Sequence, residues 1–158
     1  MPRMNEKITK KAGEAHAFAH VLETTVAANE SVMKEILGSI AKTAGKTAAQ
    51  QKTALQAICD EAGTVSTLLP KSEKTSKKIT AMGEMYVGDQ WGDSAEVLEW
   101  MSFFVGGAIV HWQLVVGAGE AMGHTSLTRI ATAGVEFYTE MLEQLKESAT
   151  KVGAERSS

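Results

Sequence analysis

Apolar side chains recur along the chain at helical spacing. In the first segment, over about residues 5–42, they follow one another at steps of three, four or seven: Phe18, Leu22, Val26, Met33, Leu37 and Ile40. No stretch alternates between apolar and polar positions in the way that a strand requires. The pattern therefore predicts an all-α chain, which we expect to form a single-domain up-and-down four-helix bundle with an additional short helix.

Capping signals and proline divide the first half of the chain. Thr47-Ala-Ala-Gln50 has the form of a capping box, which predicts that a second helix begins at Thr47. Pro70 is expected to end that helix, because proline lacks the backbone N–H that a helix interior needs. A shorter helix is expected to follow over about residues 72–87.

Turn residues divide the second half. The segment Gly88-Asp-Gln-Trp-Gly92 predicts a turn, and Asp93-Ser-Ala-Glu96 predicts the start of a helix over about residues 94–122. Gly123 is expected to close that helix. A last helix is expected from about Thr125 to Ala149.

Composition favours one globular domain. The 158 residues are 44% hydrophobic and 22% charged, which is ordinary for a folded domain of this length. We expect residues 1–158 to form that domain, with flexible ends at about 1–5 and 151–158.

Charge and cysteine content exclude some classes of protein. The net charge of −3 supplies no basic footprint for nucleic acid, so no nucleic-acid partner is expected. Cys59 is the only cysteine, so no internal disulfide can form. The charged N-terminal segment does not resemble a secretory signal, and we expect a cytoplasmic protein.

One long uncharged stretch raises the question of a membrane. Residues 100–119 contain no formal charge, and twenty residues are enough to cross a bilayer. Glu99 and Glu120 flank the stretch, and residues 79–128 contain no lysine or arginine to anchor it. These features favour a buried helix of a bundle, whose glycines would let neighbouring helices approach closely. Membrane association through residues 100–119 is the less favoured alternative.

His16, His20 and Glu23 form the first candidate metal site. Their spacing of i, i+4 and i+7 places all three on one face of the first helix, as transition-metal ligands require. The same face lies away from the centre of the apolar stripe, which favours solvated side chains on the flank or surface. A metal site and a solvated face are both left open.

His111 is the second candidate. It falls on the apolar side of the fourth helix, where an imidazole must be hydrogen-bonded or ligated. The favoured interpretation is a core histidine bonded to a backbone carbonyl or a neighbouring side chain, and the alternative is a haem or metal ligand.

Glu120 and His124 form a third, weaker pair at i and i+4 near the end of the fourth helix. A residue from another helix could complete a metal site with them. A histidine near a helix C-terminus is also favoured by the helix dipole alone, which is the simpler interpretation.

The remaining motifs carry no chemistry. Glutamates at four positions form an acidic line on the last helix, which we expect to be solvated: Glu136, Glu140, Glu143 and Glu147. The sequence contains no nucleophile elbow, zinc-protease motif, phosphate loop or dinucleotide fingerprint. No positive sign of catalysis is found.

The stretch from Val110 to Lys151 resembles the last two helices of ferritin-like stress-protein bundles. It contains a long helix with an aromatic residue after His111, a tight Met-Gly-His turn and a glutamate-rich terminal helix. The resemblance implies a helical bundle and, in members with a di-iron centre, an ExxH motif on each of two helices. No ExxH occurs in this sequence, so no ligand can be transferred from that family.

Taken together, these features predict a non-enzymatic helical bundle that acts through self-association or partner binding, most simply as a homo-oligomer. The basis is surplus apolar and small-residue surface on the first and fourth helices. No cofactor is required by the sequence. The alternative is a ferritin-like bundle for storage or oxidase-like chemistry that binds a transition metal or haem through His111 or the face of His16, His20 and Glu23.

Overall fold

A computed structural model describes residues 4–157. Within this range all regular structure is helical, which confirms the predicted all-α bundle with an additional short helix. The elements are α1 (Glu6–Ala28), α2 (Glu30–Leu37), the 3-10 turn η1 (Gly38–Ile40), α3 (Ala41–Ala62), α4 (Val65–Val87), α5 (Ser94–Met122) and α6 (Thr125–Arg156).

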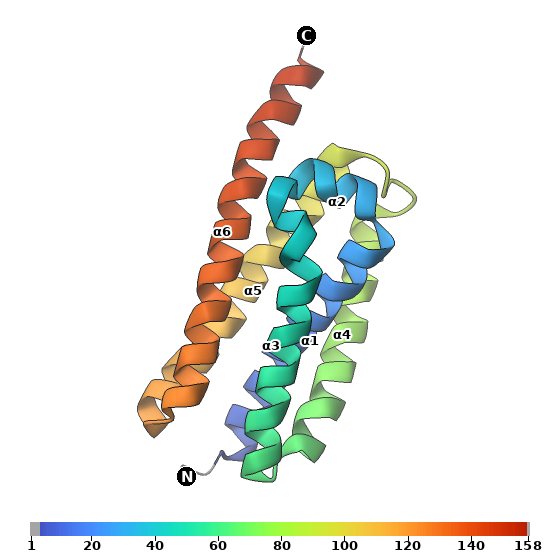
Figure 1. Ribbon diagram of the computed structural model, residues 1–158. Coiled ribbons are helices and arrows are strands. Elements are labelled where there is room, and N and C mark those ends of the chain that lie inside the picture. Colours follow the sequence, from blue (N-terminus) through green and yellow to red (C-terminus); the bar gives the residue numbers. More distant parts are fainter. Residues whose placement is uncertain (1–3, 158) are drawn as a thin grey trace.

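The long helices alternate in direction, and α1 lies in the middle of the bundle (Figure 1). It contacts α3, α4 and α5, so that it is covered on several sides. Helices α5 and α6 form a long antiparallel hairpin at one side, and α2 crosses one end of the bundle (Figure 1). The short helix of this fold is therefore α2. The prediction of a short helix over residues 72–87 is wrong, because these residues form the later part of the long helix α4.

Close packing joins α5 to α6. A Cβ atom at Gly134 would lie 2.6 Å from the indole of Trp112, so only glycine lets the two helices approach this closely. Trp112 in turn stacks on Tyr138, with 6.4 Å between ring centroids. The buried hydroxyl of Tyr138 donates to Oε1 of Gln51 at 3.2 Å, which ties α6 to α3.

The prediction of one helix over residues 5–42 is wrong. Helix α1 ends at Ala28, because Asn29 adopts φ −131° and ψ 47° and its side-chain amide donates to the carbonyl of Thr25 at 3.0 Å. A second break follows at Gly38, where φ is 58°. The apolar spacing continues through both breaks because α1 and α2 face the same core.

The expected boundaries of the second helix are also wrong. Helix α3 begins at Ala41, so Thr47 lies inside it and caps nothing. Pro70 lies inside α4, and the true break is Gly63, which caps α3 with φ 76°. Proline is tolerated here because Pro70 and Ser66, whose carbonyl loses its helical partner, are both exposed to water.

The predicted turn and helix start in the second half are confirmed. Helix α5 spans Ser94–Met122, and Oδ1 of Asp93 caps it by accepting from the amide of Ala95 at 2.9 Å. Helix α6 begins at Thr125 as expected but continues past Ala149 to Arg156. Nη2 of Arg156 pairs with Oδ1 of Asp93 at 2.9 Å, which holds the last turn against the start of α5. Of the ends expected to be flexible, residues 1–3 and 158 lie outside the described residues.

Candidate functional site

His16 is buried, contrary to the prediction that its face is solvated. The residue is 5% exposed, because α1 is central and is covered by α3 and α4 on the side away from its apolar stripe. Nε2 of His16 accepts from the amide nitrogen of Gln56 at 2.9 Å, which leaves the proton on Nδ1 to be donated to Ser72. Burial, assisted by the charges of Lys52 and His20, lowers the pKa of His16 to about 4. The ring is therefore neutral at physiological pH and links three helices.

His20 and Glu23, the other two residues of this candidate site, both contact an ammonium group. Nζ of Lys52 on α3 lies 3.1 Å from Nδ1 of His20 and 2.6 Å from Oε1 of Glu23. The lysine thus occupies the position where a cation bound by these two side chains would lie. Among residues 4–157 no group of three histidine, cysteine, aspartate or glutamate side chains converges as metal ligands would. Metal binding by His16, His20 and Glu23 stays a prediction.

His111 is hydrogen-bonded, as the favoured interpretation expected, but its side chain is 32% exposed. Nδ1 donates to the carbonyl of Gly107 at 2.7 Å, and Nε2 lies 3.2 Å from Oε2 of Glu14 on α1. The ring also packs on Phe18, with 4.7 Å between centroids. Both ring nitrogens face protein oxygens, so neither is directed at open space.

Glu120 and His124 lie in different surroundings in this fold. Glu120 is exposed near the end of α5, whereas His124 is 5% exposed. Nδ1 of His124 accepts from the amide of Leu127 at 3.2 Å, which makes the histidine the N-cap of α6. His124 directly follows Gly123, the residue that ends α5, and metal binding by Glu120 and His124 stays a prediction.

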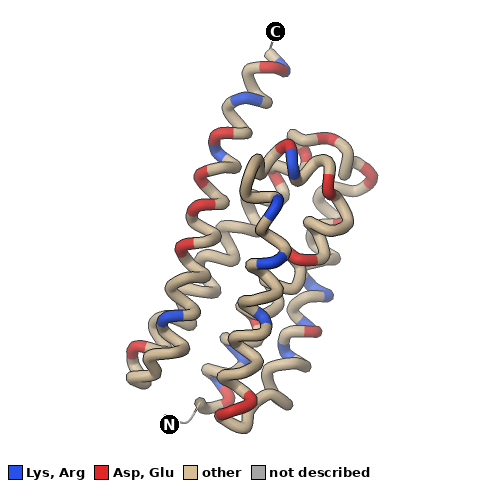
Figure 2. Tube along the Cα trace, in the orientation of Figure 1, with Lys and Arg blue, Asp and Glu red and all other residues tan. Residues whose placement is uncertain are grey.

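The acidic line on the last helix is exposed, as predicted. All four of its glutamates face solvent along α6, where Figure 2 shows a series of acidic positions. Glu143 pairs with Lys146 on the same helix at 3.3 Å. This line is a solvated face of the hairpin.

The expectation that α5 is buried holds for only one of its sides. Its outer side carries large apolar residues in solvent, with Phe103 62%, Val110 59% and Leu114 48% exposed. Gly106 and Gly117 lie on the same side, and a Cβ atom at either position would meet nothing within 4 Å. We call these five residues the α5 strip. The sequence placed them on a helix of unusually low polarity but did not show which side the bundle covers.

Helix α5 is also the one described helix that is long and apolar enough to cross a membrane. Core helices of soluble proteins pass the same test, and 39% of its most apolar window is buried in the bundle.

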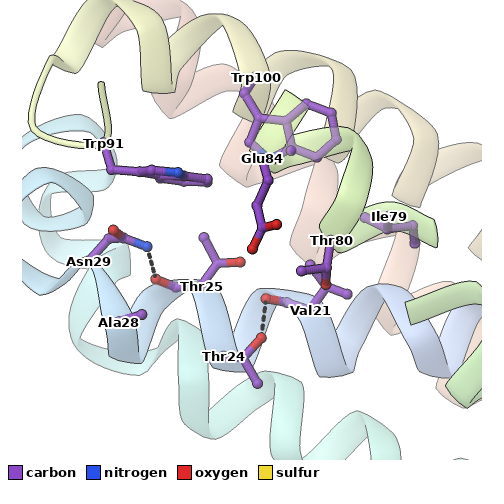
Figure 3. Close-up of a pocket in the computed structure, with 11 residues that line it drawn as sticks. Val21, Thr24, Thr25, Ala28, Asn29, Ile79, Thr80, Glu84, Trp91 and Trp100 are labelled. Atoms are coloured by element: carbon purple, nitrogen blue, oxygen red, sulfur yellow. Dashed lines mark hydrogen bonds between the residues drawn. The ribbon is translucent and has the colours of Figure 1, made fainter. Parts of the chain in front are cut away.

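A second feature missed from the sequence is a cavity of about 310 Å³ between the ends of α1 and α4 and the α4–α5 turn. The indoles of Trp91 and Trp100 line it, and the carboxylate of Glu84 points into the space between them and α1 (Figure 3). The two tryptophans are nine residues apart in the sequence, one on a turn and one on a helix.

Comparison with protein-family models, curated protein sequences and solved structures finds no match to this chain.

Proposed function

We propose that the protein acts through non-covalent association, and that the α5 strip is the surface on which a second copy of the chain docks. One observation carries the proposal. Large apolar residues and glycines occur together on one exposed side of α5, where no other helix of the described chain packs against them. Exposed apolar patches beyond a few hundred Å² are uncommon on monomers.

The order of residues along the strip fits an antiparallel copy of itself. If a two-fold axis passes Val110, a residue at a given distance before Val110 meets the residue at the same distance after it. Phe103 then faces Gly117 of the second copy, and Gly106 faces Leu114. Phe103 and Leu114 each meet a glycine and Val110 meets its own copy, which is how two closely packed helices fill the space between them.

The glycines of the strip need an explanation that the single chain does not supply. Glycine inside a helix costs about 0.5–1 kcal/mol relative to alanine. At Gly119, by contrast, a Cβ atom would lie 2.5 Å from the hydroxyl of Thr128, so packing against α6 requires glycine there. At Gly106 and Gly117 no contact with the described part of the chain requires glycine, whereas a closely packed second helix would require it.

Charge is compatible with contact between identical surfaces. Residues 100–119 contain no formal charge, so two copies of the strip do not repel each other. Apolar surface continues onto α4, where Tyr86 lies edge-on to Phe103 with 5.4 Å between ring centroids and Met82 is 53% exposed. A dimer would cover both.

Light scattering coupled to size exclusion tests the proposal. The chain is expected at twice the mass of one copy at micromolar concentration. Leu114→Glu is expected to give the mass of one copy, because it places a carboxylate in an apolar contact. Leu69→Glu is the matched control, since Leu69 on α4 is 43% exposed and lies outside the strip. A single-copy mass for the unmodified chain, or equal effects of the two substitutions, contradicts the proposal.

A further inference from the structure

The cavity beside Trp91 combines aromatic walls with one carboxylate. Trp100 is 5% exposed and lies flat on α4, where a Cβ atom at Gly83 would come within 2.9 Å of its indole. Trp91 is partly buried on the other side of the opening, at the α4–α5 turn. The Glu84 carboxylate points into the space between the two indoles and α1 (Figure 3).

No basic side chain of the cavity wall pairs with Glu84. None of the eleven residues that line the cavity is basic, and within residues 4–157 Glu84 forms neither an ion pair nor a side-chain hydrogen bond. The nearby turn adds further acidic residues, as Figure 2 shows at that end of the bundle, and residues 79–128 contain no lysine or arginine. The local field therefore attracts cations.

The floor of the cavity supplies hydrogen-bonding oxygens. Thr25 on α1 and Thr80 on α4 both line it, and neither hydroxyl donates to another side chain or carbonyl within the described residues. In Figure 3 the side chain of Thr25 lies below the Glu84 carboxylate. An N–H or O–H group placed beside Glu84 would thus find acceptors on both helices.

We propose that this cavity binds a small organic ammonium ion, held by the Glu84 carboxylate and by the faces of Trp91 and Trp100. Tryptophan is the aromatic side chain that attracts cations most strongly, and aromatic walls with a carboxylate are suited to an alkylated nitrogen that is weakly hydrated. A metal ion would find a single carboxylate here, whereas an organic cation uses the indoles as well. The site is separate from the α5 strip.

Titration with choline chloride, followed by tryptophan fluorescence, tests this assignment. A saturable change is expected with choline but neither with sodium chloride at equal ionic strength nor with the uncharged isostere in which carbon replaces the nitrogen. Glu84→Gln is expected to weaken binding at least about tenfold, because the charged partner is lost. Asp89→Asn is the matched control: it removes an acidic charge from the adjacent turn, outside the cavity, and binding is expected to change little.

A second variant assigns the signal to the cavity. Trp91→Leu is expected to weaken choline binding, measured by isothermal titration calorimetry, while circular dichroism shows the helical content unchanged. Absence of a saturable response to choline, an equal response to the uncharged isostere, or equal effects of Glu84→Gln and Asp89→Asn would each overturn the proposal.

Discussion

Nε2 of His111 on α5 lies 3.2 Å from Oε2 of Glu14 on α1. The same carboxylate lies 3.1 Å from Nζ of Lys11 on its own helix and 4.0 Å from Nζ of Lys71 on α4. Its side chain is only 14% exposed. Glu14 therefore lies at a point where side chains of three helices meet.

Removing this carboxylate should loosen the bundle. Glu14→Ala is expected to lower the free energy of unfolding by about 1–2 kcal/mol, because three basic groups lose a partly buried partner. Urea denaturation measures the change. Glu6→Ala is the control, since Glu6 is exposed and its ion pair within residues 4–157 is with Lys10 on the same helix, and it should have little effect. Equal losses in the two variants would mean that the shared contact contributes nothing.

His16 makes stability depend on pH. Its pKa is about 4 in the folded protein, below its ordinary value of 6.5, so the unfolded chain takes up the proton first as the pH falls. The stabilisation is fully present above about pH 6.5 and is lost progressively towards pH 4, by roughly 2–3 kcal/mol. His16→Gln should reduce this pH dependence, measured as the difference in unfolding free energy between pH 7 and pH 4.5.

The matched control is His20→Gln. His20 is exposed, so although burial and Lys52 also lower its pKa, less stability depends on its state. A pH dependence that is unchanged in His16→Gln but reduced in His20→Gln would reverse this assignment.

Two glycines of α5 should respond to alanine in opposite directions. In a Leu114→Glu background, which keeps the chain from associating, Gly106→Ala is expected to stabilise the fold by about 0.5–1 kcal/mol through helix propensity. Gly119→Ala is expected to destabilise it by roughly 1–3 kcal/mol, because the new methyl group meets Thr128 on α6. Chemical denaturation of both variants measures these changes. Destabilisation by Gly106→Ala would show that a methyl group at position 106 meets other atoms of the chain.

The contact between Tyr138 and Gln51 should contribute to stability through its buried hydroxyl. Tyr138→Phe leaves the Gln51 carbonyl without its donor and is expected to cost about 1–2 kcal/mol in thermal or urea unfolding. Burial also raises the pKa of Tyr138, so its phenolic hydroxyl should stay protonated until the protein unfolds in alkali. The exposed Tyr86 serves as control: Tyr86→Phe should change stability little, and an equal loss there would contradict the account.

Sequence reasoning identified the helical class and the second half of the fold because local signals there are unambiguous. Asp93 caps α5 through its side chain, Gly123 ends the helix through its own backbone conformation, and neither effect depends on what the helix packs against. In the first half the deciding features are tertiary. Asn29 ends α1 although the apolar spacing continues into the next helix. Pro70 is tolerated because its side of α4 faces water.

The candidate sites were harder to predict for a related reason. His16 lies outside the apolar stripe of its helix, yet α3 and α4 cover it, and this depends on α1 being central. The same arrangement leaves the outer side of α5 uncovered, although its sequence is the most apolar of the chain. Periodicity shows which residues share a face, but only the packing of the other helices decides whether that face is covered.

A cysteine at position 110 tests the central claim most directly. In the antiparallel dimer Val110 faces Val110 of the second copy, so Val110→Cys places two thiols near the two-fold axis, within reach of a disulfide. Mild oxidation is expected to give a cross-linked dimer on non-reducing gels from Val110→Cys but not from Leu69→Cys, while the buried Cys59 stays unreacted. No cross-link at position 110, or equal cross-linking at position 69, would contradict association through the α5 strip.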